Sequence, residues 1–202
     1  MADDVGGGQG GGTADEAASV LASRWPRTLA ERVDPETLAE SWIRSRRGAG
    51  AAGLPAYPRA PLSPALASAL FEARRARRVV RGLEPASAAL AQGAAGRRAA
   101  AHRQRAGEVE GDGAAGRAVR IARLVVISAD ASARLFRKIE RLYADHRDVV
   151  EVLVVLTDEL GLGAASFGPG ERARVVLIDH KDAVARILAA VELALDPSAS
   201  AG

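Results

Sequence analysis

Three short apolar runs alternate with amphipathic stretches between residues 122 and 195, and this alternation limits the folds available to the chain. The runs are apolar at successive positions, as in strands that are covered on both faces. The stretches between them are amphipathic: the first, for example, places Leu135, Ile139 and Leu142 at helical spacing. We therefore expect an α/β domain in which helices cover both faces of a sheet. The expected strands are 124–127, 149–156 and 174–178, and the expected helices are 132–146, 158–165 and 181–195.

The strand residues supply the expected core of this domain. Five of them should be fully buried in the sheet: Val125, Ile127, Val154, Val176 and Ile178. A charge at such a position would be left without a partner away from water, which is strongly unfavourable.

The first 60 residues form an extension of a different character. Residues 1–13 are mostly glycine, which predicts a flexible tail. Helices are expected over 14–24 and from Asp34-Pro35 to about Arg47, since an acidic N-cap followed by proline is a typical helix start. Four prolines indicate a linker over 48–64. The next helix starts at Ser63-Pro64 and places Phe71 in the core.

Residues 94–120 consist mainly of alanine, glycine and arginine and show no apolar periodicity. This composition predicts a disordered insertion, because such a segment has little apolar surface to bury. The expected organisation is an extension over 1–60, a domain over 61–196 that contains this insertion, and a tail over 197–202.

Several functional classes are disfavoured by composition. The chain has no cysteine, which excludes disulfides, thiolate metal sites and a cysteine nucleophile. No apolar run approaches the ~20 residues that span a bilayer, and the first residues lack the pattern of a secretory signal. We expect a cytoplasmic monomer without a membrane partner.

The chain is rich in arginine: 26 of its 28 basic residues are arginine. Positive charge is concentrated in the middle third of the chain. Residues 61–120 carry a net charge of +6, whereas residues 1–60 and 121–202 carry −1 and −2. Five arginines lie within eight residues: Arg74, Arg75, Arg77, Arg78 and Arg81. This asymmetry favours a polyanionic partner.

Catalytic patterns are weak by comparison. Asp130 and Asp179 each follow an apolar strand, where carboxylates can bind metal or assist phosphoryl transfer, but no phosphate-binding glycine–lysine loop accompanies them. We expect both to cap the helix that follows. The three histidines lie on separate segments and are expected at the surface. No enzyme activity, metal or cofactor is predicted.

Several motifs, taken in order, resemble the L-seven-Ae family of ribosomal proteins, which includes kink-turn RNA binders and bacterial ribosome-associated relatives. The bacterial type is the most similar, over roughly residues 62–195 with an insertion at 94–120. The matching segments are Ala73–Gly82, Ala89–Gly93, Ala122–Ser132, Thr157–Gly161 and Gly170–Asp179. The resemblance implies a three-layer α-β-α sandwich with a small mixed sheet.

The resemblance also implies where RNA would bind: around the helix start after the first short strand and around the loop before the last strand. The corresponding residues, with the adjoining arginines, are Arg74, Arg75, Arg78, Arg81, Gly82, Glu84, Thr157, Leu160, Arg172 and Arg174. Where the family carries an Asn-Glu-x-x-Lys signature, this chain has Glu84 to Ala88 without the asparagine or the lysine. Binding through arginine contacts to phosphate, with little reading of bases, is therefore expected.

The expected function is a non-catalytic RNA-binding protein associated with the ribosome or another ribonucleoprotein, with RNA and ribosomal proteins as partners. Two alternatives remain open. One is a nucleotide-binding or phosphoryl-transfer enzyme that uses Asp130 and Asp179. The other is a protein-interaction domain that has lost RNA binding.

Overall fold

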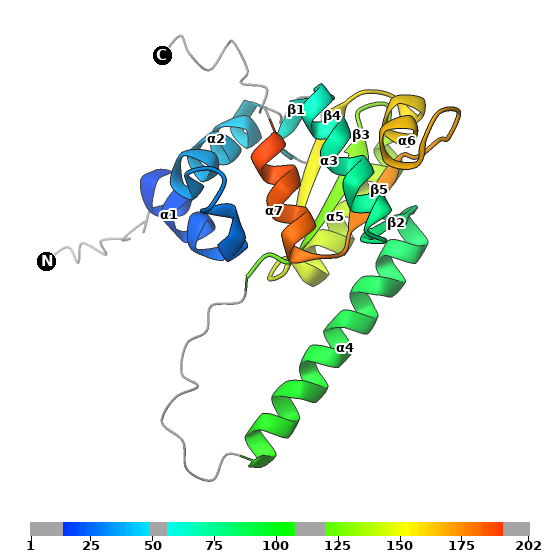
Figure 1. Ribbon diagram of the computed structural model, residues 1–202. Coiled ribbons are helices and arrows are strands. Elements are labelled where there is room, and N and C mark those ends of the chain that lie inside the picture. Colours follow the sequence, from blue (N-terminus) through cyan, green and yellow to red (C-terminus); the bar gives the residue numbers. More distant parts are fainter. Residues whose placement is uncertain (1–13, 49–55, 108–119, 192–202) are drawn as a thin grey trace, which may run out of the picture.

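The computed structural model describes residues 14–48, 56–107 and 120–191, and it shows a sheet between two layers of helices (Figure 1). The helices are α1 (Ala14–Arg24), a short 3-10 helix (Arg27–Leu29), α2 (Pro35–Gly48), α3 (Pro64–Arg75), α4 (Leu83–Gly107), α5 (Ala133–His146), α6 (Glu159–Phe167) and α7 (Lys181–Ala190). The strands are β1 (Arg59–Pro61), β2 (Val79–Arg81), β3 (Arg123–Ser128), β4 (Val150–Leu156) and β5 (Val175–Ile178). The expected α/β class is confirmed.

The five strands form one mixed sheet in the order β1-β4-β3-β5-β2. The strands β1, β4 and β3 are parallel, whereas β5 runs antiparallel to both β3 and β2. The carboxyl ends of β1, β2, β3 and β4 therefore lie along one edge of the sheet, together with the start of β5. We call this the carboxyl edge and the opposite one the amino edge. The helices α3, α4, α5 and α6 all begin at the carboxyl edge.

Successive strand residues face two different cores. One core lies between the sheet and the layer that contains α1, α2, α3, α6 and α7, and it includes Leu124, Val126, Val176 and Ile178. The other lies between the sheet and α4 and α5, and it includes Val125, Ile127 and Val154. All five residues expected in the sheet core are at most 2% exposed, which confirms that prediction.

Two segments differ from the expected structure. Residues 94–107 continue α4 as helix instead of forming a disordered insertion, because alanine and arginine have high helix propensity even without an apolar stripe. The remainder of that expected insertion, 108–119, lies outside the described residues, as do the expected tails at 1–13 and 197–202. The expected linker contains β1, which gains its partner from β4: Arg59 is opposite Val154. Phe71, expected in the core, is 47% exposed.

The N-terminal helices belong to the same core as the sheet. Trp25, Leu29 and Trp42 are at most 1% exposed and join the cluster that covers one face of the sheet. The rings of Trp25 and Trp42 meet edge to face, with their centroids 5.4 Å apart. The expected boundary at residue 60 therefore does not separate two packing units.

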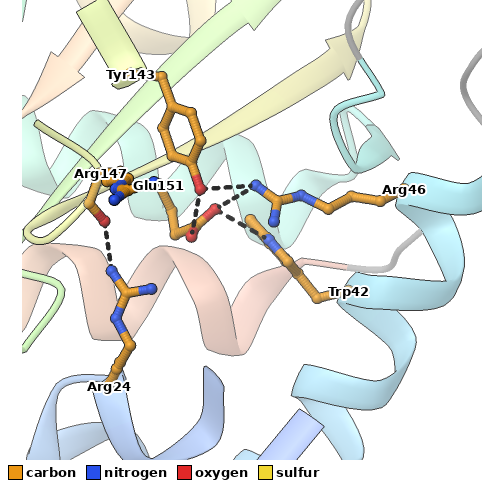
Figure 2. Close-up of polar contacts among 6 residues, drawn as sticks. All are labelled: Arg24, Trp42, Arg46, Tyr143, Arg147 and Glu151. Carbon is orange, nitrogen blue, oxygen red and sulfur yellow. Dashed lines mark hydrogen bonds and ion pairs between the residues drawn. The ribbon is translucent and has the colours of Figure 1, made fainter. Parts of the chain in front are cut away.

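A buried polar cluster connects α2 to β4 and α5 (Figure 2). The Glu151 carboxylate, whose side chain is 1% exposed, accepts hydrogen bonds from Arg46 at 2.9 Å, Tyr143 at 3.3 Å and Trp42 Nε1 at 3.4 Å. Burial raises the pKa of Glu151, while the charge of Arg46 opposes that rise. Burial by itself would lower the pKa of Arg46, but Glu151 and Tyr143 raise it. Each of the two charges, on Glu151 and on Arg46, therefore offsets the cost of burying the other.

Among the described helices, none combines the length and the apolar character needed to cross a bilayer.

Substituting Val176 with aspartate should abolish cooperative folding. Val176 is fully buried, and an unpaired buried charge costs several kcal/mol, comparable with the ~5–15 kcal/mol stability of a typical domain. A thermal melt followed by circular dichroism would measure this. The control Val20→Asp, at a position that is 58% exposed, should retain a cooperative transition. A normal melt for Val176→Asp would contradict the assigned core.

Substituting Arg46 with methionine should destabilise the fold by about 3–5 kcal/mol at neutral pH, because Glu151 would be left as an uncompensated buried charge. The pKa of Glu151 would then rise further, so the deficit should grow as pH increases above 4.5, the ordinary value of the carboxyl, and shrink below it. Urea denaturation at several pH values measures this. Adding Glu151→Gln should restore part of the loss and flatten the pH dependence.

Candidate nucleic-acid interface

The carboxyl edge carries an open groove between the starts of α4 and α5. Its volume is about 430 Å³, and it is lined by Gly82, Leu83, Glu84, Pro85, Ser132, Arg134, Leu135, Lys138 and Arg174. Three of these residues are cations and one is a carboxylate. Two helix N-termini reach this groove, and their backbone N–H groups and dipoles favour anions.

The local sequence explains why both helices begin here. Gly82 has φ +88°, a left-handed conformation that glycine adopts without strain, and its carbonyl accepts the first helical hydrogen bond, from Ala86. In α5 the Ser132 hydroxyl accepts from Leu135 N at 3.3 Å. The helix α4 is thus preceded by a glycine, which has no side chain to cap it, whereas α5 is capped by a serine.

Acidic residues hold several arginines in place beside the groove. Glu159 contacts Arg174 at 2.9 Å and Arg172 at 3.5 Å, although these two side chains stay 53% and 67% exposed. Arg81 pairs with Glu171 at 2.7 Å and also donates to the Arg172 carbonyl. Exposed ion pairs of this kind contribute little to stability. They position the guanidiniums and leave them accessible.

Phe167, at the end of α6, contacts Arg81 and one further arginine, Arg74. The guanidinium of Arg81 lies 5.0 Å from the centre of its ring, and that of Arg74 lies 5.9 Å away. Both distances are in the range of cation–π contacts. The ring therefore joins the end of α3 to the end of β2.

The structure brings together only some of the residues expected from the sequence. Gly82, Glu84 and Arg174 line the groove, and Arg81 and Arg172 are joined beside it. Thr157 and Leu160 lie at the carboxyl edge, just before and within the first turn of α6, where Leu160 is 44% exposed.

The expected arginine cluster is divided. Arg75 and Arg78 are exposed at the end of α3 and in the turn before β2, and they do not line the groove. The carbonyl of Arg78 accepts from Asp179 N at 2.9 Å, which places it near the amino edge. Sequence reasoning missed Arg134 and Lys138. Their signal was a pair of basic residues four positions apart on the first turns of a capped helix.

The two strand-end aspartates do not cap the helices that follow them, contrary to expectation. Ser132 and His180 are the N-caps of α5 and α7. Asp130 instead accepts from Ser128 Oγ at 2.5 Å and from Glu159 N at 3.3 Å, at the start of α6. Asp179 forms an ion pair with Arg123 at 2.5 Å.

Asp130 and Asp179 also cannot form a common catalytic site. They follow β3 and β5, which are antiparallel, so they lie at opposite edges of the sheet. In the described part of the chain, no group of three or more histidine, aspartate or glutamate side chains is arranged to hold a metal ion.

Comparison with known proteins identifies no family. No family model matches the chain, and no curated protein matches it. Among solved structures, the chain is similar to a protein with unknown function from Bacillus halodurans C, with 20% sequence identity and a TM-score of 0.39. That match covers 62% of this chain and 98% of the other. The likeness is too distant to support an argument about function.

Substituting Gly163 with alanine should destabilise the loop that presents Arg172 and Arg174. A Cβ at Gly163 would lie 2.2 Å from the Glu171 carbonyl oxygen, so the loop would have to shift. We expect a loss of about 1–3 kcal/mol, the usual effect of overpacking, measured by urea denaturation.

The control Gly96→Ala meets nothing within 4 Å in the middle of α4. It should stabilise the protein by roughly 0.5–1 kcal/mol, as alanine does in place of glycine in a helix. If both substitutions changed the free energy of unfolding by the same amount, the close approach of the Glu171 carbonyl to Gly163 would be contradicted.

Proposed function

We propose that the protein is a non-catalytic RNA-binding protein, associated with a ribonucleoprotein, that binds the RNA backbone along its carboxyl edge. The observation that carries the proposal is the groove between the starts of α4 and α5, where Arg134, Lys138 and Arg174 surround two helix N-termini. Phosphate is the ligand that this combination fits best.

Charge and preorganisation support a phosphate ligand. The groove is lined by three cations and by one carboxylate, that of Glu84, and Arg174 also pairs with Glu159 at 2.9 Å beside it. Arg174 and Arg172 are partly oriented by Glu159, which reduces the side-chain freedom that they lose when they meet phosphate. Each phosphate contact also releases counterions, which favours binding at low salt.

The groove also supports weak sequence specificity. Glu84 and Ala88 occupy the positions at which the L-seven-Ae family, which this chain resembles, carries the asparagine and lysine of its signature. Glutamate lacks the paired donor and acceptor of an amide, and alanine has no hydrogen-bonding group. The remaining contacts are to phosphate and sugar, which position a protein on RNA but carry no sequence information directly.

Two exposed leucines favour a second candidate, a protein-interaction surface. Leu156 at the end of β4 and Leu160 in the first turn of α6 are 43% and 44% exposed. A protein partner, such as a ribosomal protein, would cover these two apolar side chains at the carboxyl edge. The two candidates are compatible, since ribonucleoproteins present RNA and protein together.

The triple variant Arg134→Gln/Lys138→Gln/Arg174→Gln should weaken RNA binding about equally for kink-turn and unrelated RNAs. Each lost phosphate contact should flatten the log–log dependence of affinity on salt by about 0.7 for single-stranded RNA, or roughly 2 for all three. Fluorescence anisotropy with labelled RNA over a salt series measures both effects. The matched control Arg27→Gln/Arg32→Gln/Arg44→Gln removes three exposed cations away from the groove and should change neither.

Ultraviolet crosslinking separates this function from nucleotide chemistry. Crosslinking to total RNA, compared with a panel of labelled nucleotides, should give RNA adducts that decrease in the triple variant. Crosslinks to one nucleotide alone, lost on Asp130→Asn and unchanged in the triple variant, would replace the RNA proposal with the enzyme class.

A further inference from the structure

The helix α4 extends far beyond the sheet that its first turns cover (Figure 1). Ala86 and Leu90 are buried in the core, whereas residues 95–99 are exposed. The 25 residues of α4 correspond to a helix of about 37 Å at ~1.5 Å per residue. One end of this rod thus lies at the groove, and the other projects past the amino edge. We call residues 95–107 the arm.

The composition of the arm indicates what could cover it. Its residues include Arg97, Arg98, Arg103 and Arg105, with no acidic residue and no apolar side chain larger than alanine. A helix that packs against another protein core needs an apolar stripe, which this sequence lacks. Its charge is instead complementary to a polyanion.

The base of the arm gathers like charges. A Cβ at Gly93 would lie 3.3 Å from Arg123 Nη2 and 3.5 Å from Arg97 Nη1, so these two guanidiniums converge on the same point. Partial burial lowers the pKa of Arg97, and the charges of Arg123 and Arg98 act in the same direction, whereas Asp148 opposes them. Asp179 pairs with Arg123 but lies on its Nε side. A bound anion would relieve the remaining repulsion.

We propose that the arm, together with Arg123 at its base, is a second RNA-binding surface that engages duplex RNA extending from the groove past the amino edge. This inference rests on the RNA-binding function proposed above, and it adds that the bound RNA is long enough to reach from the groove to the arm. Arg97 lies about 21 Å and Arg105 about 33 Å along the helix from Leu83, at ~1.5 Å per residue. An RNA that lies along α4 would contact first the groove and then the arm.

RNA length provides the test. At a spacing on the order of 3 Å per base pair in an A-form RNA helix, a hairpin of about 5 base pairs bound at the groove does not reach Arg97, whereas a duplex of about 15 base pairs extends past the arm. The variant Arg97→Gln/Arg98→Gln/Arg103→Gln/Arg105→Gln should bind the long duplex about tenfold or more weakly at low salt. Its salt dependence should flatten by about 2 units or more, while its affinity for the short hairpin stays unchanged.

The matched control replaces the same four arginines with lysine. Glutamine and lysine have similar helix propensities, so circular dichroism should show intact helix in both variants. The lysine variant retains the charge and should keep most of the affinity for the long duplex. Loss of affinity in both variants alike would overturn an electrostatic role for the arm.

Each outcome separates this inference from the function on which it rests. If the glutamine variant binds both RNAs normally while the groove variant loses both, the arm inference is wrong and the proposed function stands. If the unmodified protein binds neither RNA, the proposed function itself fails. If the unmodified protein binds a DNA duplex of the same length more tightly than the RNA duplex, the assignment of the arm to RNA is overturned.

Discussion

The buried Glu151 carboxylate sets the strictest condition on this structure. A charge in a central strand is stable only when donors and a cation surround it, because burial disfavours the ionised form. Trp42 and Arg46 come from α2 and Tyr143 from α5, so these helices have defined positions relative to β4. Ser45 of the same α2 accepts from Arg59 N at 3.1 Å and fixes the start of β1. The N-terminal helices and the edge of the sheet are thus linked to one acidic side chain.

The regular elements after residue 120 were predictable because local and global signals agree there. Strands such as β5 are apolar on both faces, and the helix α5 combines a serine cap with buried Phe136, Ile139 and Leu142. Three features were not predictable from these signals. The strand β1 is a proline-containing segment that depends on pairing with β4, the arm of α4 relies on propensity without periodicity, and Glu151 is a lone acid in an apolar run. Each depends on partners that a local reading of the sequence does not include.

The candidate interface shows the same division. The resemblance identified Gly82, Glu84 and Arg174, because their positions follow from short motifs at strand ends. Arg134 and Lys138 belong to a different helix, and only the three-dimensional arrangement places them opposite the start of α4. Conversely, Arg75 and Arg78 are neighbours of Arg81 in sequence but are separated from it by the length of β2. Proximity along the chain therefore predicted one large cluster from Arg74 to Arg81, which the fold divides. It also gave no indication that Arg134 and Lys138 line the groove.

The pairing of Trp42 with Glu151 has a consequence for how the protein is made. The two residues are separated by 109 positions, and ribosomes add about 5–20 residues each second. Trp42 is thus incorporated roughly 5–20 s before its acceptor, Glu151. During that interval α1 and α2 can already bury apolar surface against each other, and the edge-to-face contact of Trp25 and Trp42 needs no residue beyond them. The tryptophan contact is thus available early, whereas Trp42 and Arg46 of α2 lack the Glu151 carboxylate until β4 is synthesised, and chaperones have that interval in which to bind α2.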